Sequence, residues 1–305
     1  DQITYKKGGN LKRFLLILAM LCGVTALVMG KSLSISSETW IDYQADFNDQ
    51  FDAIGKGNFY IGRQRFHFAG ELNEFIEGKV TLDFSSSALS NDAYFRLAYA
   101  RFNLAEPFRI TVGMQQLQFG IHPFWSSPMP ISSHPSIKKV IPSYDLGLGF
   151  SGMLADGVFE YDLQFMNGEG YKTWYAQDDV NFAGTANALL NYTEMGTVGL
   201  SYLYADVETD FDMAFALFIY HELDFASIMF EFLGELTDAE LDSYFSTMLT
   251  VNAMDTLDFL ARVDAKMDAD TEVYIGANYH PIDEVQIKPL VGIYLLEQTE
   301  FFLKA

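Results

Sequence analysis

Charged side chains spaced by two are the residues of this sequence that could act on a solute. Arg63, Arg65 and His67 share one side of an extended segment, because successive side chains of a β-strand point to opposite faces. A basic row of this kind can steer anions. Alternatively, the three groups pair with Glu77, Asp83 and neighbouring acids and hold the wall in shape.

The same alternation places polar residues on one side of several other segments. We expect one shared polar face, formed by Arg63, Arg65, His67, Glu77, Lys79, Asp83, Arg109, Gln115, Asp258, Arg262, Asp264 and Lys266. In 93–103 the alternation fails, since Arg96 and Arg101 fall on opposite sides. This failure predicts a β-bulge in that segment.

The elements that must position these residues are strands. No long stretch between the candidate strands has a helical period. The turns at 154–157 and 280–283 are short, whereas 119–143 and 167–193 are long, which is typical of a barrel with short turns at one end. The fifteen candidate strands are 34–47, 58–69, 74–84, 93–103, 107–118, 144–153, 157–166, 195–204, 210–221, 224–235, 242–253, 256–267, 271–280, 283–295 and 299–305.

The apolar faces of these strands decide which side meets water. They are rich in Phe, Tyr, Leu and Met over runs of about ten residues, as a tilted membrane-spanning strand requires. A soluble sandwich would leave few aromatic residues outside. The pattern predicts an all-β protein, a transmembrane antiparallel β-barrel with a polar interior. In 107–118 the residues expected to face lipid are Phe108, Ile110, Val112 and Met114, and those expected to face the interior include Arg109, Thr111 and Gln115.

The N-terminal segment has the layout of a secretory signal. Residues 11–30 combine a basic start, an apolar stretch and small residues near Gly30. We expect 1–10 to be a translated upstream leader with the true start at Leu11, 11–30 a cleaved signal peptide, and 31–305 the barrel. A membrane anchor is the alternative for 11–30. A lipoprotein site at Cys22 is disfavoured by the bulky residue before it.

Composition excludes several functions. The chain of 305 residues has a formal charge of −22, and after residue 30 it holds 15 basic against 40 acidic groups, a charge of −25. Nucleic acid is therefore not an expected partner. The one cysteine lies in the leader and the five histidines have no metal-binding spacing, so we expect neither metal nor cofactor. An outer-membrane hydrolase with His221 or His280 as base is a weaker alternative, because no nucleophile elbow is present.

Several short motifs resemble the phosphate-selective porin O and P family. They are AYARFNLAEPFRITVGMQQLQFG at 98–120, DLGLGFSG at 145–152, FEYDLQFMNGEG at 159–170 and YHPIDEVQIKPLVGI at 279–293. The resemblance implies a Gram-negative outer-membrane barrel, commonly of sixteen strands and trimeric, that admits ions and small hydrophilic solutes passively. We expect the sixteenth strand within 167–193, for example at 171–175, and fourteen strands are the alternative.

The long segment 119–143 is expected to fold inward. The resemblance implies that it narrows the pore, with His122, Trp125, His134, Lys138 and Lys139 as constriction residues. An external cap or a trimer contact is the alternative. The sequence ends in TEFFLKA where the family has an aromatic residue, so we expect a truncated closing strand. Phosphate selectivity is not expected, because the body is acidic.

The function we predict is that of a porin, an outer-membrane channel that is not an enzyme. Its expected partners are solutes, outer-membrane lipid and two further copies of the chain. A closed barrel that serves as an adhesin or structural surface protein is the alternative, and it would not conduct ions.

Overall fold

The computed structural model describes residues 32–47, 58–85, 93–121, 143–168, 170, 182–207, 210–237, 240–267, 271–282, 285–287, 290–295 and 301–304. Within these ranges the regular elements are β-strands. No helix in the described part of the chain is long and apolar enough to cross a membrane. Residues 1–30, where we expect a leader and a signal peptide, lie outside the described residues.

Seventeen strands follow one another in the described residues. They are β1 (Ser32–Phe47), β2 (Asn58–Asn73), β3 (Ile76–Ser85), β4 (Ala93–Ala105), β5 (Phe108–Gln116), β6 (Tyr144–Leu154), β7 (Phe159–Met166), β8 (Ala183–Thr193), β9 (Gly196–Val207), β10 (Asp210–Leu223), β11 (Ala226–Thr237), β12 (Glu240–Met254), β13 (Leu257–Lys266), β14 (Thr271–Ile282), β15 (Val285–Ile287), β16 (Leu290–Leu295) and β17 (Phe301–Lys304).

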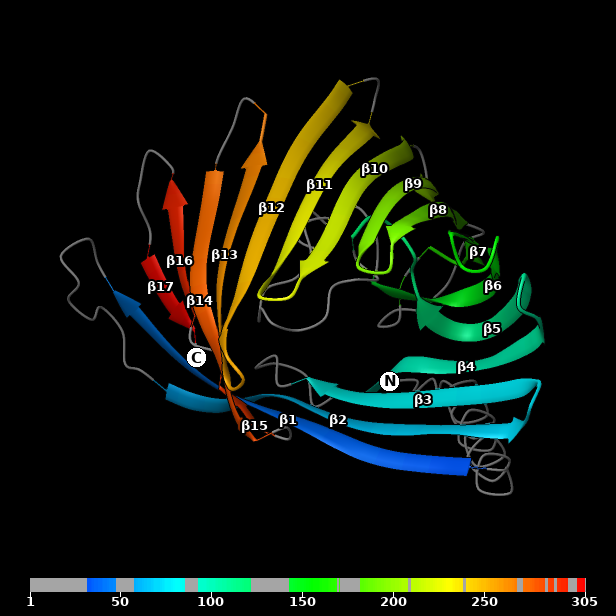
Figure 1. Cartoon of the computed structure of the whole chain (residues 1–305), viewed down its shortest axis with the longest axis horizontal. Coiled ribbons are helices and arrows are strands. Elements are labelled where there is room, and N and C mark those ends of the chain that lie inside the picture. The colour runs from blue at the N-terminus through cyan, green and yellow to red at the C-terminus, as the bar shows by residue number, and fades with distance from the viewer. Residues whose placement is uncertain are drawn as a thin grey trace, which may run out of the picture.

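The strands close into one antiparallel ring (Figure 1). Strand β1 pairs with β2 along most of its length, and its last four residues, Gln44–Phe47, pair with β17, which closes the ring over this stretch. Both β15 and β16 pair with β14, at opposite ends of it, so these two short strands share one position. The seventeen strands therefore fill sixteen positions, as predicted. The strand missing from the sequence prediction is β8, which lies within 167–193, whereas 171–175 lies outside the described residues.

The two ends of the ring differ. Five turns of two residues, at 74–75, 106–107, 194–195, 224–225 and 255–256, lie at what we call the short-turn end. The connections at the opposite, long-loop end include 48–57, 86–92, 117–143 and 167–182. The predicted asymmetry is confirmed, although the connections after β9 and β11 at the long-loop end are also short.

The wall has an apolar outer row and an inner row. On β10, Phe215, Leu217 and Ile219 are 38–44% exposed, whereas Ala216 and Phe218 between them are fully buried. Only the inner row can pack around a segment that crosses inside the ring, so the exposed row is the outer one. On β5, Phe108 and Val112 are exposed on the outer row as predicted, but Met114 is buried.

The predicted bulge is present in β4. The register between β3 and β4 shifts between Thr81 and Leu82, which pair with Leu97 and Phe95. Arg96 is therefore the extra residue. Because a bulge changes the alternation of the following side chains, Arg101 lies on the inner face opposite Glu77 and Thr111.

The interior is not polar throughout, which corrects the sequence prediction. Apolar side chains from the inner rows of β9–β13 and neighbouring elements form two buried clusters. The first holds Leu117, Phe119, Met166, Ala183, Leu203, Ala214, Ala216, Leu233 and Tyr244, and the second Ile121, Phe218, Met229, Met248, Leu260 and Tyr274. Residues 117–121, which follow β5, belong to both clusters and cover this part of the wall.

Candidate pore wall and its inward segment

Ion pairs join the inner rows of β1, β2 and β3. Asp83 lies 3.3 Å from Arg63 and 3.4 Å from Arg65, measured from carboxylate oxygen to guanidinium nitrogen. Arg65 also lies 3.2 Å from the carboxylate of Glu38. Asp83 and Arg65 are buried, whereas Arg63 keeps about a quarter of its side chain exposed (27%). Arg63 and Arg65 of the basic row are therefore paired with acids, as in the alternative interpretation of the sequence.

The pairs continue toward the short-turn end. The His67 ring lies 3.5 Å from Glu38 and 3.0 Å from the hydroxyl of Thr81. Arg101 pairs with Glu77 at 2.9 Å and donates to Thr111 at 3.2 Å. Acids and bases thus alternate on the inner face of β1–β4, and those of β2 and β3 lie on the side of their strands that alternation predicted.

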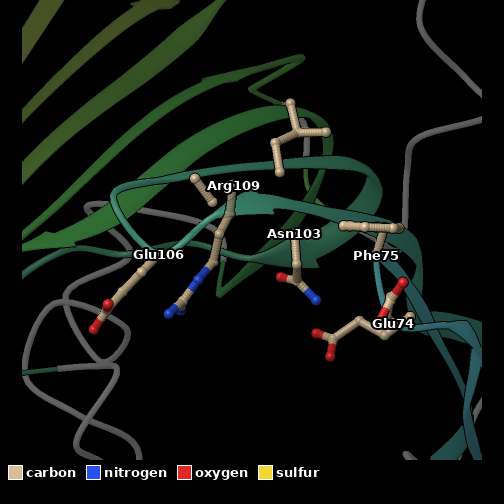
Figure 2. A pocket seen from close by; sticks show the side chains of 8 residues that line it. Glu74, Phe75, Asn103, Glu106 and Arg109 are labelled. Carbon is tan, nitrogen blue, oxygen red and sulfur yellow. The ribbon is translucent and has the colours of Figure 1, made fainter.

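Lys79 and Arg109 complete the basic residues of this face. Lys79 stands opposite Ala69 and Tyr99 in the ladder, on the same face as the ion pairs. Arg109 lines a hollow at the short-turn end together with Glu74, Glu77 and Glu106. Figure 2 shows Arg109, Asn103 and Glu106 extending from neighbouring positions into this hollow. The end of the wall is therefore acidic, with one arginine among three carboxylates.

Arg96 is a site residue on which the sequence pattern gave no firm prediction. Its guanidinium lies 4.2 Å from the centre of the Tyr144 ring, and it donates a hydrogen bond to the Tyr144 hydroxyl. Stacking on an aromatic face stabilises a cation without neutralising it. The side to which Arg96 points could not be read from alternation, because Arg96 is itself the bulged residue.

Residues 117–121 cross the inner wall and are held by side chains from every second strand. The backbone N–H of Gln118 donates to Gln164 on β7 at 2.8 Å, and that of Gly120 to Ser201 on β9 at 2.9 Å. The N–H of Ile121 donates to the carboxylate of Glu231 on β11 at 2.8 Å. We call residues 117–121 the inward segment. Its docking confirms, for the described start of the long loop, the predicted inward course.

Small residues make room for the inward segment. Leu117 and Phe119 are fully buried in the cluster that includes Ala214 and Ala216 of β10. Gly120 has a backbone φ of +56°, and a Cβ there would lie 2.2 Å from Glu231 Oε1. The segment thus lies too close to the wall for a side chain at this position.

The anchoring residues were missed by sequence reasoning. Gln164, Ser201 and Glu231 are 0–2% exposed and lie in otherwise alternating strands, where each looked like an ordinary interior residue. An available signal was the pair of alanines in β10, 214 and 216, at inner positions of a strand with large outer residues. Small inner residues indicate that another backbone approaches the wall.

The predicted residues of β13 lie on the inner face, and two of them are buried. Arg262 is fully buried, pairs with Asp264 at 2.7 Å and lies 5.9 Å from the Tyr274 ring centre. Lys266 pairs with Asp242 at 2.7 Å near the long-loop end. Asp258 accepts a hydrogen bond from Asn278 at 3.3 Å.

Gln115, also predicted for the polar face, is buried. Its side chain is 5% exposed and contacts the amide of Gln164, one of the side chains that hold the inward segment. It therefore belongs to the polar groups behind that segment.

The remaining predicted site residues are the constriction candidates of the long loop and the candidate histidine bases. The constriction candidates His122, Trp125, His134, Lys138 and Lys139 lie outside the described residues. In the described part of the chain, no group of three or more His, Cys, Asp and Glu residues is placed to hold a metal ion. The ring of His221, one of the two candidate bases, stacks on Tyr192 and lies 2.7 Å from its hydroxyl on the outer row.

The comparisons decide the family. Residues 34–216 match the model of the phosphate-selective porin O and P family. The chain belongs to this family. It is therefore a porin of the Gram-negative outer membrane, and family and fold point to a channel for solutes and away from an enzyme.

Solved structures share the fold of this porin at low sequence identity. OmpF of Salmonella typhi, in complex with daunomycin, aligns at a TM-score of 0.66 and 11% identity, over 91% of this chain and 97% of the other. The trimer form of OmpT of Vibrio cholerae gives 0.62 and 10%, over 90% and 98%. The outer-membrane channel DcaP of Acinetobacter baumannii gives 0.60 and 11%, over 90% and 96%. No curated protein sequence matches significantly.

Proposed function

We propose that this porin lets ions and small hydrophilic solutes diffuse passively along the β1–β5 side of its interior. The observation that carries the proposal is the contrast between two opposite walls. The inward segment covers apolar inner-row side chains of β9–β12, whereas the inner face of β1–β5 carries charged side chains with partial exposure, such as Arg63 and Arg101. Solvated charge favours a water-filled path on that side.

The predicted polar face supplies the lining of the proposed path. Its residues on β2, β3 and β5 are Arg63, Arg65, His67, Glu77, Lys79, Asp83 and Arg109, joined by Arg96 and Arg101 of β4. On the strands β2–β5 the six arginine and lysine residues outnumber the three acids, Glu71, Glu77 and Asp83, although the whole body is acidic. We therefore propose a modest preference for anions, set by this wall rather than by net charge.

Planar-bilayer recording of the full chain under a KCl gradient tests the proposal. Stable conductance steps with an anion-favouring reversal potential are expected. Replacing Arg63 and Arg65 together by Gln should move that potential toward cations, while Lys266→Gln, at the rim and far from this wall, should leave it nearly unchanged. Absence of steps from folded protein would contradict the channel, and a cation-favouring wild type would contradict the assigned preference.

We also propose that the working form is a homotrimer. The support is the trimeric state of a solved barrel with the same fold. Mass measurement of the protein extracted in mild detergent tests it, with three copies expected.

A further inference from the structure

A tyrosine and a histidine form a hydrogen-bonded pair on the outer wall, close to the short-turn end. The rings of Tyr192 on β8 and His221 on β10 are nearly parallel, at an angle of 10° and with 5.7 Å between their centres. The Tyr192 hydroxyl lies 2.7 Å from His221 Nδ1. We call these two residues the Tyr–His pair.

The pair lies where the apolar outer band ends. On β10 the outer row continues from the exposed Leu217 and Ile219 to His221, which is the third residue from the end of the strand. On β8 the exposed Leu190 precedes Tyr192 in the same way. At a rise of about 3.4 Å per residue and a tilt of about 45°, His221 lies about 11 Å from the middle of β10, near the edge of an apolar band about 25 Å tall. The pair is therefore at the level of lipid headgroups.

A glycine of the intervening strand makes room for the pair. Gly196 stands opposite His221 in the ladder, on β9, which lies between β8 and β10 (Figure 1). A Cβ at Gly196 would lie 2.6 Å from the Tyr192 hydroxyl and 2.7 Å from His221 Nδ1. The two side chains therefore pack over bare backbone, and the hydrogen bond between them restricts the orientation of the imidazole.

The far nitrogen of the imidazole remains available to a ligand. Within the described residues, no hydrogen bond or ion pair is formed by His221 Nε2. In the tautomer in which Tyr192 donates to Nδ1, the hydrogen of the neutral ring lies on Nε2, so this atom is a donor. Acyl chains cannot accept its hydrogen bond, whereas the phosphate oxygens of a headgroup accept strongly. The pair is therefore suited to hold a lipid phosphate.

The lipid that reaches the pair is phospholipid. The short turns of outer-membrane barrels face the periplasm. The short-turn end therefore contacts the inner leaflet of the outer membrane, whose lipids are phospholipids.

The charge of this part of the wall favours one kind of headgroup. Residues 182–237 contain nine acids and no lysine or arginine. An anionic phospholipid would therefore be repelled here and would find no ion-pair partner. A headgroup that carries an ammonium beside its phosphate has no net charge, and its ammonium can donate to carboxylates.

Two exposed carboxylates are placed to accept from such an ammonium. Glu194 begins the turn between β8 and β9, and Asp224 begins the turn between β10 and β11. The backbone N–H of Glu222 donates to the carbonyl of Met195 at 2.7 Å, which holds the two chain segments side by side. Neither Glu194 nor Asp224 forms an ion pair with a described residue. Both carboxylates therefore lie on the periplasmic side of the Tyr–His pair and remain open to a ligand.

We propose that the Tyr–His pair binds the headgroup of a phospholipid of the phosphatidylethanolamine type. A phosphate oxygen accepts from His221 Nε2, and the ammonium donates to Glu194 and Asp224. The acyl chains lie along outer-row side chains such as Leu190 and Ile219, which are 47% and 42% exposed. The site is on the outer wall, so the inference depends on neither the proposed conduction nor the proposed trimer.

Competition between lipids tests the site. The full chain is exchanged into a neutral detergent that holds equal amounts of phosphatidylethanolamine, phosphatidylcholine and phosphatidylglycerol with the same acyl chains, and native mass spectrometry measures the lipid retained. Wild-type protein should retain the ethanolamine lipid about tenfold over the other two, since one hydrogen bond to a charged group accounts for such a factor. The choline headgroup has no N–H to donate, and the glycerol headgroup has no ammonium. Equal retention of the three lipids would overturn the proposal.

Substitutions in the pair locate the bound lipid. His221→Phe keeps an aromatic ring but removes the donor, and should lower retention of the ethanolamine lipid about tenfold. Tyr192→Phe removes the hydroxyl that orients the imidazole and should lower it less. The matched control is Tyr202→Phe, because Tyr202 is an outer-row tyrosine of β9 with nearly the same exposure, 45% against 46%, and lies away from the short-turn end. The variants are compared at equal folded fraction, measured by circular dichroism. Unchanged retention in His221→Phe, or an equal loss in Tyr202→Phe, would overturn the assigned site.

The turn carboxylates are tested separately. Glu194→Gln with Asp224→Asn should abolish the preference for ethanolamine over choline, because the ammonium loses its acceptors while the phosphate keeps His221. A preserved preference would overturn the headgroup assignment. Water-soluble phosphoethanolamine in excess should not displace the lipid, because it has no acyl chains. Displacement would show a site for a soluble ligand and would overturn the lipid as occupant.

Discussion

Two opposite walls of the barrel have different inner faces: one is charged, and the other is partly apolar. Strands β1–β4 face inward with alternating acids and bases, whose pairs, such as Arg65 with Asp83, keep charge in place. Strands β9–β12 face inward with Ala216, Leu233 and Met248, which a soluble core would also contain. The difference is explained by what lies against each wall. Charged side chains on the first wall suit contact with water, whereas the inward segment packs against the second.

The comparison teaches that an inner position of a barrel has no fixed polarity. Inner residues become apolar where the chain folds back on the wall, because the wall then buries area against protein. Some polar groups behind the segment accept a backbone N–H, as Ser201 and Glu231 do, and others, such as Asn187, accept a hydrogen bond from these anchoring side chains. A strand can therefore be apolar on both faces and still belong to a channel.

Removing the largest side chain of the inward segment should have the largest effect on stability. Phe119 is fully buried, so Phe119→Ala should reduce the free energy of unfolding by about 3–5 kcal/mol. Denaturant unfolding of the refolded protein measures it. Phe165→Ala, on the outer row at 61% exposure, is the control and should cost less. Equal losses would break the distinction between the two faces.

A side chain at Gly120 should lift the inward segment from its wall. Gly120→Ala combines a left-handed backbone with a Cβ that meets Glu231, and should cost about 1–3 kcal/mol. Single-channel conductance should change with it, because the segment leaves its dock. Gly157→Ala is the matched control, since Gly157 also has a positive φ but an added Cβ there would meet open space. A conductance change in the control alone would contradict the assignment.

Removing one of the side chains that anchor the inward segment should destabilise the protein less than the two preceding substitutions. Ser201→Ala removes the acceptor for the Gly120 N–H and should cost about 1 kcal/mol, with conductance nearly unchanged because Gln164 and Glu231 still hold the segment. Unfolding and bilayer recording measure the two effects. A loss as large as that of Phe119→Ala would show that the hydrogen bonds, rather than the apolar contacts, dominate the docking.

The smallest free-energy effect is expected from a substitution in the charged wall. Asp83→Asn leaves Arg63 and Arg65 less neutralised, so the ratio of anion to cation permeability should rise about twofold at 0.1 M salt, which is about 0.4 kcal/mol. The change should shrink at 1 M salt, where the Debye length is about 3 Å. Asp242→Asn, at the rim, removes the same charge and should change the ratio less. Equal shifts would mean that net charge, and not this wall, sets selectivity.

The sequence by itself determined the barrel, fifteen of its sixteen strand positions and the polar face of β2 and β3. Period-two alternation is a local property, and each strand such as 74–84 carries it independently of what it pairs with. The bulge at Arg96 was also predictable, because an inserted residue breaks that period within one segment.

Tertiary structure alone decided what each inner residue meets. Ser201 and Glu231 are some thirty residues apart in sequence, yet both hold the inward segment because β9 and β11 lie under its course. The partners of Thr39 and of Asp83 likewise depend on register between strands, which alternation within a strand does not fix. The side of the strand to which a residue points is set by its neighbours along the chain. The residues that it contacts are set by how the ring closes and by where the long loop returns to the wall.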